Sequence, residues 1–197
     1  WRNQVQAGRG FNLFADLQYR GIGYAASGTE NDLNTFTFDK NYRFFNPKAG
    51  FTWQSSPETQ FYGSVAIAHR EPVRDDLVDN QSGSVPRPEK LFDYEIGLRR
   101  KAGKWNLNAN AYYMFYRDQL VLTGALNDVG ANIRTNVPVS YRMGIELDGG
   151  VRIHQKLRWI GNLTASRNRI REFEEVLYDY GDNFDQYNEV RILHRNT

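Results

Sequence analysis

The chain has 197 residues, of which 25 are basic and 23 acidic, and it contains no cysteine. The near balance of charge gives no electrostatic reason to expect nucleic acid or an anionic membrane surface as a partner. The absence of cysteine excludes a disulfide framework, a thiolate metal site and a thiol nucleophile. No run of eighteen apolar residues is present, which excludes a membrane-spanning helix.

The first forty residues alternate between apolar and polar side chains in short stretches. Residues 1–7 are expected to end one strand before a turn at 8–10, and residues 11–20 to form the next strand. The alternation slips at 21–23, which predicts a bulge or a strand end there. The polar segment 26–41 is expected to be a connection.

A second pair of strands is expected around a tight turn at 55–59. Its first strand covers residues 45–54, with Pro47 near the rim, because proline removes a donor from the ladder. Its second strand runs from Phe61 to Ile67.

The strands between Leu91 and Ile153 have the clearest pattern. In one of them the apolar side chains fall on odd positions, namely Trp105, Leu107, Ala109, Ala111, Tyr113 and Phe115. Polar residues fill most even positions, so this strand has one apolar and one polar face. Its length is about 33 Å, or about 23 Å along the axis when tilted by about 45°, close to the apolar band of about 25 Å in outer-membrane barrels.

Connections alternate between short and long along the chain. The expected short turns are 55–59, 101–104 and 154–156, and the expected long segments are 70–90, 117–140 and the polar stretch after a last strand at 157–165. This alternation is typical of outer-membrane β-barrels. A soluble β-sandwich binding or adhesion module, whose core would be filled by the aromatic rings, is the alternative.

Aromatic residues of the apolar parity gather near both ends of the strands. Those near short turns are Trp53, Phe61, Trp105 and Trp159, and those near the long segments are Phe45, Phe92, Tyr113, Phe115 and Tyr141. Two aromatic girdles that flank a band of aliphatic residues are expected at the two interfaces of a membrane.

Several stretches resemble the barrel of TonB-dependent outer-membrane receptors, namely YRFFNPKAGFTW, AHREPVRDDLVDN, PRPEKLFDYEIGLR, NANAYYMFYRDQLVLTG and VPVSYRMGIELDGGVRI. The resemblance covers nearly the whole chain and is strongest from Tyr42 to Arg169. It implies an all-β fold, an antiparallel up-and-down transmembrane β-barrel of about 22 strands whose lumen holds a plug. It also implies the bacterial outer membrane as the location. The implied function is TonB-driven import of a scarce ligand of the siderophore-iron, haem, cobalamin or glycan class.

The chain lacks parts that this resemblance would lead us to expect. Too few strands are present to close such a barrel, so residues 1–197 are expected to be an incomplete segment of the barrel domain, without signal peptide or plug. Family members tend to finish on an aromatic residue that serves assembly, whereas this chain stops at Thr197 in a polar stretch. The expected partners are outer-membrane lipid, the receptor's own plug with TonB acting through it, and a small extracellular ligand. Nucleic acid is not expected.

No arrangement of residues indicates catalysis, a metal site or a cofactor. The three histidines, at 69, 154 and 194, lack metal-ligand spacing, and no Ser-His-Asp or paired-carboxylate arrangement stands out. The missing nucleophile counts against a barrel enzyme such as a lipase. We therefore expect a binding and transport protein and no enzyme.

Two groups of charged residues are candidates for a functional role. The first opens a long segment and is placed to touch a ligand, although a solvated loop held by its own ion pairs explains it equally well: Arg70, Glu71, Arg74, Asp75 and Asp76. The second has the polar parity and is expected to face the lumen, mainly as structural ion pairs: Asp93, Glu95, Arg99, Arg142, Glu146, Asp148, Arg152 and Arg158.

Overall fold

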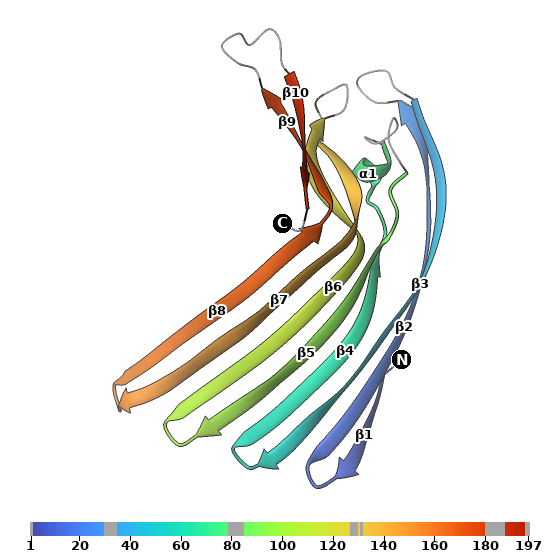
Figure 1. The fold of residues 1–197 in the computed structure, drawn as a ribbon. Helices are drawn as coiled ribbons and strands as arrows, with labels where there is room; N and C mark the ends of the chain where they lie inside the picture. Colours follow the sequence, from blue (N-terminus) through green and yellow to red (C-terminus); the bar gives the residue numbers. More distant parts are fainter. Residues whose placement is uncertain are drawn as a thin grey trace.

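The computed structural model describes residues 2–29, 35–78, 85–126, 130, 132–179 and 188–195. These residues form ten strands and one short helix (Figure 1). In chain order the elements are β1 (Arg2–Gly8), β2 (Phe11–Thr29), β3 (Thr35–Ser56), β4 (Thr59–Arg70), α1 (Arg74–Val78), β5 (Glu89–Ala102), β6 (Trp105–Leu126), β7 (Asn132–His154), β8 (Leu157–Arg171), β9 (Phe173–Asp179) and β10 (Asn188–His194).

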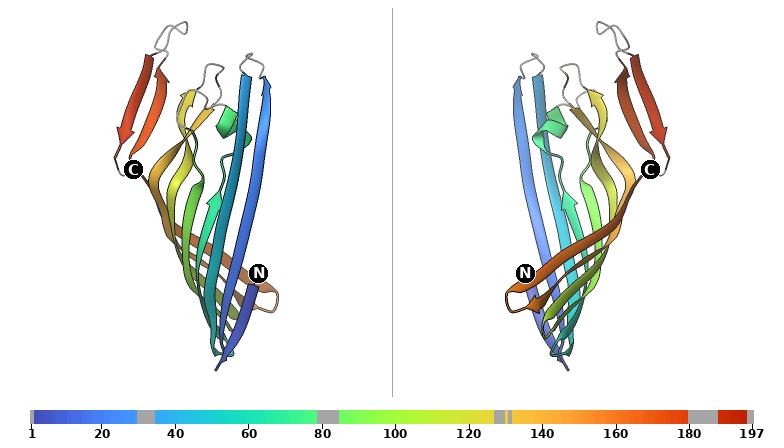
Figure 2. Two further views of the ribbon diagram at one scale, coloured as in Figure 1. Left: turned by 90° about the vertical axis from the view of Figure 1, so that its right-hand side faces the viewer. Right: turned by 90° about the vertical axis from the view of Figure 1, so that its left-hand side faces the viewer.

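Eight strands form one open antiparallel sheet whose spatial order, from β1 to β8, is the order of the chain. The β9–β10 hairpin is a separate two-stranded sheet beyond the end of β8. Figure 2 shows the long strands as one curved wall. The all-β, up-and-down prediction is confirmed. A β-sandwich is wrong for the described residues, because no second sheet packs face to face on the first.

The helix content of the described chain is limited to α1. No helix in these residues is long and apolar enough to cross a membrane.

The register of the sheet places apolar and polar residues on opposite sides. On β6, Ala109 pairs with Leu98 of β5, whereas the preceding residue, Asn108, pairs with Arg99. The same separation continues on both flanks, and we call the two sides the apolar face and the polar face. A slip of one residue would exchange them, so the register fixes which side the sheet presents to an apolar environment.

β2 and β3 are much longer than the sequence pattern predicted. Their ladder runs without a break from Phe11 to Thr29 of β2. The expected interruption at 21–23 is therefore wrong, because these residues are paired like their neighbours. The expected connection at 26–41 is wrong for its described residues, which continue the two strands.

Pro47 lies in the middle of β3, and its expected position near a rim is wrong. On one side it pairs with Leu17 of β2. On the other side the β3–β4 ladder, followed from the short turn, ends at the pair Lys48–Ala66, just before it would reach Pro47. A residue without an N–H group thus stands where that ladder stops, as expected for proline in a sheet.

Other strands also continue past their expected ends. β6 and β7 take up most of the segment 117–140, β8 continues to Arg171, and β9 and β10 form a hairpin in the C-terminal stretch. The segment 70–90 instead contains α1, which the alternation did not predict. The short turns at 55–59, 101–104 and 154–156 are confirmed.

Two glycines on the polar face make room for tyrosine rings from neighbouring strands. A Cβ at Gly97 would lie 2.5 Å from the ring of Tyr62, and one at Gly144 would lie 2.7 Å from the hydroxyl of Tyr112. The Tyr62 hydroxyl donates a hydrogen bond to Asn110 Oδ1 at 3.1 Å. These rings therefore lie across the polar face, where only glycine leaves them space.

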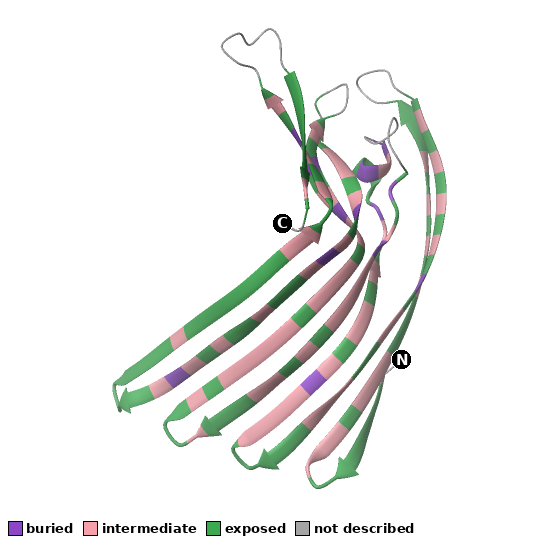
Figure 3. Cartoon of the chain, viewed as in Figure 1, coloured by how far each residue is buried: buried purple, intermediate pink, exposed green. Residues whose placement is uncertain are grey.

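The buried side chains gather at the end of the sheet that carries the long connections (Figure 3). Among the residues that the structure describes, the buried hydrophobic ones are Phe44, Val78, Leu120, Val137 and Val176. We call the part of the sheet between the two aromatic girdles the band, and the strand segments beyond Tyr19, Phe45, Phe115 and Tyr141 the extensions. All five buried hydrophobic residues lie in or beside the extensions, whereas the apolar face of the band is largely exposed in the isolated chain.

Candidate ligand surface

The hydrophobic alternation of β2 and β3 inverts at the upper edge of the band, although their register does not change. Within the band the odd positions carry apolar residues such as Leu13 and Phe51. Beyond Phe45 the odd positions of β3 become polar, and the even positions become largely aromatic. The inversion therefore reflects a change of surroundings, from an apolar to an aqueous one on the outer side.

Aromatic rings line the inward side of this extension, and we call them the ring row: Tyr24, Phe36, Phe38, Tyr42 and Phe44. The rings of Phe36 and Phe38 stack with centroids 6.0 Å apart, and Tyr24 lies 5.0 Å from Phe38. Further down, Tyr42 stacks on Phe44 at 5.9 Å. Phe44 is buried, whereas the other four rings are half-buried and keep part of their surface accessible.

Arg20 connects the foot of the ring row to the end of β4. Its guanidinium lies 5.2 Å from the Phe44 ring centroid, donates to the His69 carbonyl at 3.2 Å and forms an ion pair with Glu71. His69 stacks on Phe44 from another side at 5.2 Å, and its Nδ1 lies 2.8 Å from Asn46 Oδ1. The base of the ring row is therefore held by stacking, hydrogen bonds and charge together.

Two titratable groups of this region lie beyond the band. Burial raises the pKa of the Tyr42 hydroxyl, and the Glu71 carboxylate raises it further. Burial lowers the pKa of the His69 imidazole, and the Lys90 and Arg20 cations lower it further. Near neutral pH both side chains therefore stay uncharged and act as hydrogen-bonding, stacking groups.

The segment around α1 joins the β2–β3 extension to the β6–β7 extension, across the gap where β4 and β5 end (Figure 1). On one side the Arg74 guanidinium lies 5.2 Å from the centroid of Phe36. On the other side Asp76 pairs with Arg134 of β7 at 3.0 Å. Pro72, two residues before the helix, is fully buried, so the segment is anchored by a buried side chain and by contacts on two sides.

The five loop residues that the sequence singled out fall into two sets. Arg70 pairs with Glu89, Glu71 pairs with Arg20, and Asp76 pairs with Arg134 while accepting the Val73 N–H at 2.9 Å. These three residues make intramolecular contacts that hold the segment. Arg74 and Asp75 pair with each other at 3.6 Å, and their side chains are 48% and 70% accessible. The Arg70 side chain is also exposed, at 61%, although it is paired with Glu89.

The eight residues expected in the lumen do lie on the polar face, but the expected ion pairs among them are wrong. Within the described chain, no salt bridge joins any two of these eight residues. Arg99 instead bonds Gln60 at 3.2 Å and stacks over Tyr62 at 4.4 Å. The register explains this, because cross-strand neighbours are not opposite charges: Arg152, for example, pairs directly with Arg158.

The girdle residues occupy the apolar face at both ends of the band. At the short turns Trp53 stacks on Phe61 with centroids 5.6 Å apart. At the other end Tyr113 lies 6.0 Å from Tyr141, and Phe115 lies 6.0 Å from Phe92. The expected girdle positions Trp105 and Trp159 are 38% and 60% exposed, which suits rings that meet an external phase.

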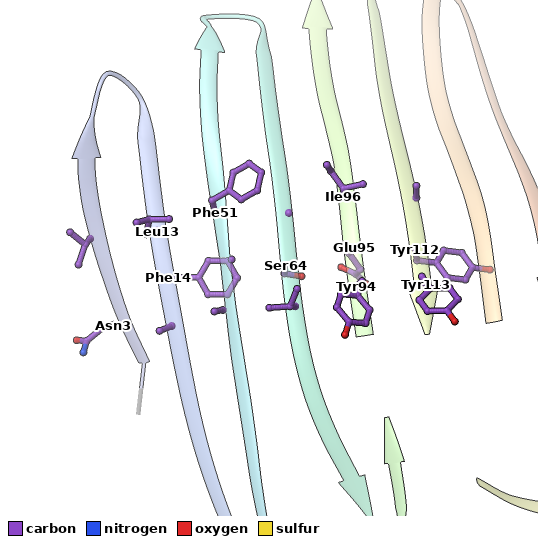
Figure 4. A pocket seen from close by; sticks show the side chains of 17 residues that line it. Asn3, Leu13, Phe14, Phe51, Ser64, Tyr94, Glu95, Ile96, Tyr112 and Tyr113 are labelled. Carbon is purple, nitrogen blue, oxygen red and sulfur yellow. The ribbon is translucent and has the colours of Figure 1, made fainter. Parts of the chain in front are cut away.

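A hollow of about 930 Å³ lies in the band and receives side chains from β1 to β6 (Figure 4). Most of its lining belongs to the apolar face, including Leu13, Phe51, Tyr94, Ile96 and Tyr113. The polar groups of the lining are few, namely Asn3, Ser64, Glu95 and the tyrosine hydroxyls. The hollow is therefore suited to hydrocarbon more than to a water-soluble ligand.

The sequence reading missed the ring row because it treated residues 26–41 as a polar connection. The signal was present, since Phe36 and Phe38 alternate with Thr35 and Thr37, but with the apolar residues on the opposite parity.

In the described part of the chain, no group of three His, Cys, Asp or Glu residues is close enough to hold a metal ion.

These features define a class of protein: a segment of a large antiparallel barrel that crosses a membrane with strands. Residues 3–192 match the family model described as "TonB dependent receptor-like, beta-barrel". The chain belongs to this family, whose members are receptors and transporters of the outer membrane, and the sequence-based family assignment is confirmed.

Solved structures of several transporters have a similar fold. The FrpB iron transporter from Neisseria meningitidis (F3-3 variant) is 19% identical with a TM-score of 0.63, over 86% of this chain and 25% of that one. The copper transporter OprC is 16% identical with a TM-score of 0.73, over 85% and 28%. The ferric-catecholate import receptor Fiu from K12 E. coli is 16% identical with a TM-score of 0.60, over 88% and 27%.

The chain thus spans about a quarter of the length of these structures. Comparison with curated protein sequences gives no match.

Proposed function

We propose that residues 1–197 form part of the barrel domain of a receptor that binds a scarce extracellular ligand and imports it with energy supplied through TonB. The observation that supports the binding role is the ring row beyond the band, with Arg20 at its foot and Arg74 at its top. Ring faces and guanidinium groups recognise flat and anionic groups by stacking and charge. This chemistry favours an aromatic metal chelate or haem over a neutral glycan.

Within this proposal the residues of the 70–76 segment have different tasks. Arg74 and Asp75 contact the ligand, since their side chains are exposed beside the ring row. Arg70, Glu71 and Asp76 position the segment through Glu89, Arg20 and Arg134. The ferric-catecholate import receptor among the similar structures supports an aromatic, anionic ligand class.

The polar face of the band is proposed to meet the receptor's own plug domain, through which TonB acts. The charged residues Arg99, Arg142, Glu146 and Asp148 are exposed on this face of the described chain. They are the groups that a domain inside the lumen can contact, and the segment alone is not expected to transport.

Ligand binding by the intact receptor tests the proposal. Cells that depend on the receptor would be given radiolabelled ferric catecholate, ferric hydroxamate, haem and cobalamin, and surface binding and uptake would be measured for each. For the compound taken up, Phe36→Leu and Arg74→Gln should weaken binding by roughly threefold to thirtyfold. Arg43→Gln is the matched control, because it removes the same charge from the outward side of the same extension.

Two results would contradict the proposal. One is normal assembly with unchanged affinity in both Phe36→Leu and Arg74→Gln. The other is an equal loss in Arg43→Gln, which would show that charge removal anywhere on the extension disturbs the receptor.

A further inference from the structure

Two neighbouring short turns, β5–β6 and β7–β8, carry a concentration of exposed basic residues. We call them the rim cluster: Lys101, Lys104, Arg152, Lys156 and Arg158. The sequence has no acidic residue from 99 to 117 or from 149 to 171. The other two short turns are different, since one carries Arg9 and the other Glu58. One part of the short-turn rim is therefore strongly basic, although the net charge of the whole chain is only +2.

Contacts between the strands make this cluster continuous from β5 to β8. The Arg152 N–H donates to the Lys104 carbonyl at 2.8 Å, which joins the two turns. The Arg158 side chain reaches across β7 and donates to Asn106 Oδ1 of β6 at 3.4 Å. Asn106 in turn pairs directly with Lys101 of β5. The proximity of these cations thus follows from hydrogen bonds and register.

The cluster contains a pair of like charges that the fold itself does not explain. Arg152 and Arg158 are direct partners in the β7–β8 ladder, and like charges in this arrangement destabilise a sheet. Among the described residues, no carboxylate forms a salt bridge with any member of the cluster. Glu58 in the next turn accepts the Lys101 N–H through its backbone carbonyl. The opposed arginines therefore lack a counter-ion within this part of the chain.

The register also places the two arginines outside the band. The pair Val151–Trp159 carries a ring of the girdle at the short turns, and Arg152–Arg158 is the next pair toward the turn. Successive residues of a strand point to opposite sides, so these arginines are on the side away from Trp159 and from lipid. Their position beyond the girdle exposes them to the aqueous phase. A partner must accordingly reach them from water.

The extent of the cluster indicates what kind of anion it fits. Neighbouring strands are about 4.8 Å apart, so the cations from β5 to β8 extend over about 14 Å. A single carboxylate or phosphate can contact only a part of this row. An extended peptide advances about 3.3 Å per residue, and acidic residues at alternate positions present their carboxylates on one side, about 6.6 Å apart. A short acidic peptide therefore matches both the charge and the length of the row.

We propose that the rim cluster binds an acidic segment of a separate water-soluble protein, on the side of the membrane that the short turns face. The position beyond the girdle favours such a protein over a domain held within the lumen. Charge complementarity of this kind also speeds the encounter of two proteins. The assignment concerns the short-turn rim and does not depend on which ligand the ring row binds.

The test is a titration of the intact receptor, in nanodiscs of zwitterionic lipid, with a fluorescent ten-residue peptide in which Glu and Ser alternate. Fluorescence anisotropy gives the affinity, and the peptide with Gln in place of Glu is the comparison. The wild type should bind the acidic peptide at least about tenfold more tightly. Arg152→Gln with Arg158→Gln should weaken this binding by about threefold to thirtyfold. Arg152→Lys with Arg158→Lys should keep most of it.

The matched control, Arg9→Gln with Arg43→Gln, removes the same number of charges outside the cluster and should change the affinity by less than about twofold. Equal affinity for the two peptides would overturn the proposal, as would an equal loss in the control and in the cluster variant. Displacement of the peptide by 10 mM inorganic phosphate at constant ionic strength, about 10 mM being ample for a weak anion site, would also overturn it. A lowered unfolding midpoint in Arg158→Gln would show that the arginine pair serves the fold.

The source of the acidic segment is tested in cells, with a photo-crosslinking amino acid in place of Gln155 at the tip of the β7–β8 turn. Mass spectrometry of the cross-linked peptides should map the adduct to an acidic segment of another protein. The same adduct should be lost in Arg152→Gln with Arg158→Gln. An adduct within the receptor's own chain, an adduct with lipid, or no adduct at all would overturn the assignment to a separate protein.

Discussion

The band and the β2–β3 extension are built on the same uninterrupted ladder, yet their apolar residues lie on opposite sides of it. In the band, the odd residues of these strands are apolar and exposed, as at Leu13 and Leu17, which are 46% and 41% accessible. In the extension, the even residues carry the rings, and Phe44 is 6% accessible. The backbone is the same in both regions, so the phase outside the sheet decides which parity is apolar. An inversion of alternation within one strand therefore marks the edge of the membrane.

The largest expected effect comes from placing a charge on the apolar side of the band. Ala109→Arg puts a guanidinium between the two girdles, facing lipid, and should cost about 2–4 kcal/mol of folding free energy. Asn108→Arg points into the lumen and should be tolerated. The measurement is the folded fraction of the intact receptor in urea titrations into lipid vesicles. Equal stability of the two variants would contradict the assignment of faces.

A second pair of variants compares one side of β2 at two heights. Ala15 lies in the band and Ala25 in the extension, and both have the outward parity. Ala15→Arg should cost about 2–4 kcal/mol, whereas Ala25→Arg faces water and should cost at most about 1 kcal/mol. The same urea titration gives both values. A similar large cost at both positions would mean that the band extends over the whole strand.

The third prediction concerns the contact that joins the two extensions. The Asp76 side chain is 3% accessible and pairs with Arg134. Asp76→Asn keeps an acceptor for the Val73 N–H but removes the ion pair, and should lower the opening free energy of residues 72–78 by about 1.5–3 kcal/mol. Hydrogen exchange measures this quantity. Asp75→Asn, at a 70% accessible side chain, is the control and should change it by less than about 0.5 kcal/mol.

The smallest effect is expected at the other contact of the same helix. Arg74→Gln removes the cation from the face of Phe36 and should lower the opening free energy of α1 by about 0.5–1 kcal/mol. Hydrogen exchange again provides the value. A loss as large as that of Asp76→Asn would show that the β3 contact fixes the helix as strongly as the β7 contact does.

The alternation of apolar and polar residues predicted a strand correctly where each side of the strand has the same surroundings along its whole length. The alternation of residues 105–115 predicted one apolar and one polar face, and the register confirms that the two sets of side chains lie on opposite sides of the sheet. The same reasoning failed at 26–41, because the outer phase changes from lipid to water there and the alternation reverses. The sequence pattern therefore predicted a polar connection where the described residues of β2 and β3 are paired.

Contacts between distant segments could not be predicted either. The Asp76–Arg134 pair joins residues 58 positions apart, and nothing in either local pattern refers to the other. The lumen charges were placed on the correct face, but their partners depend on register, which put Arg152 opposite Arg158.

The most direct test of the inversion is a spin-label scan along the outward positions of β3. These 197 residues contain no cysteine. In an intact receptor from which any cysteine elsewhere has been removed, single cysteines can be placed at odd residues from 35 to 53 and labelled in lipid vesicles. Collision rates with oxygen, which partitions into lipid, and with a water-soluble nickel chelate would be measured at each position. Labels at 45–53 should collide mainly with oxygen and labels at 35–43 mainly with nickel, with the change between Arg43 and Phe45. Oxygen-dominated collisions that continue to residue 37 would contradict the account.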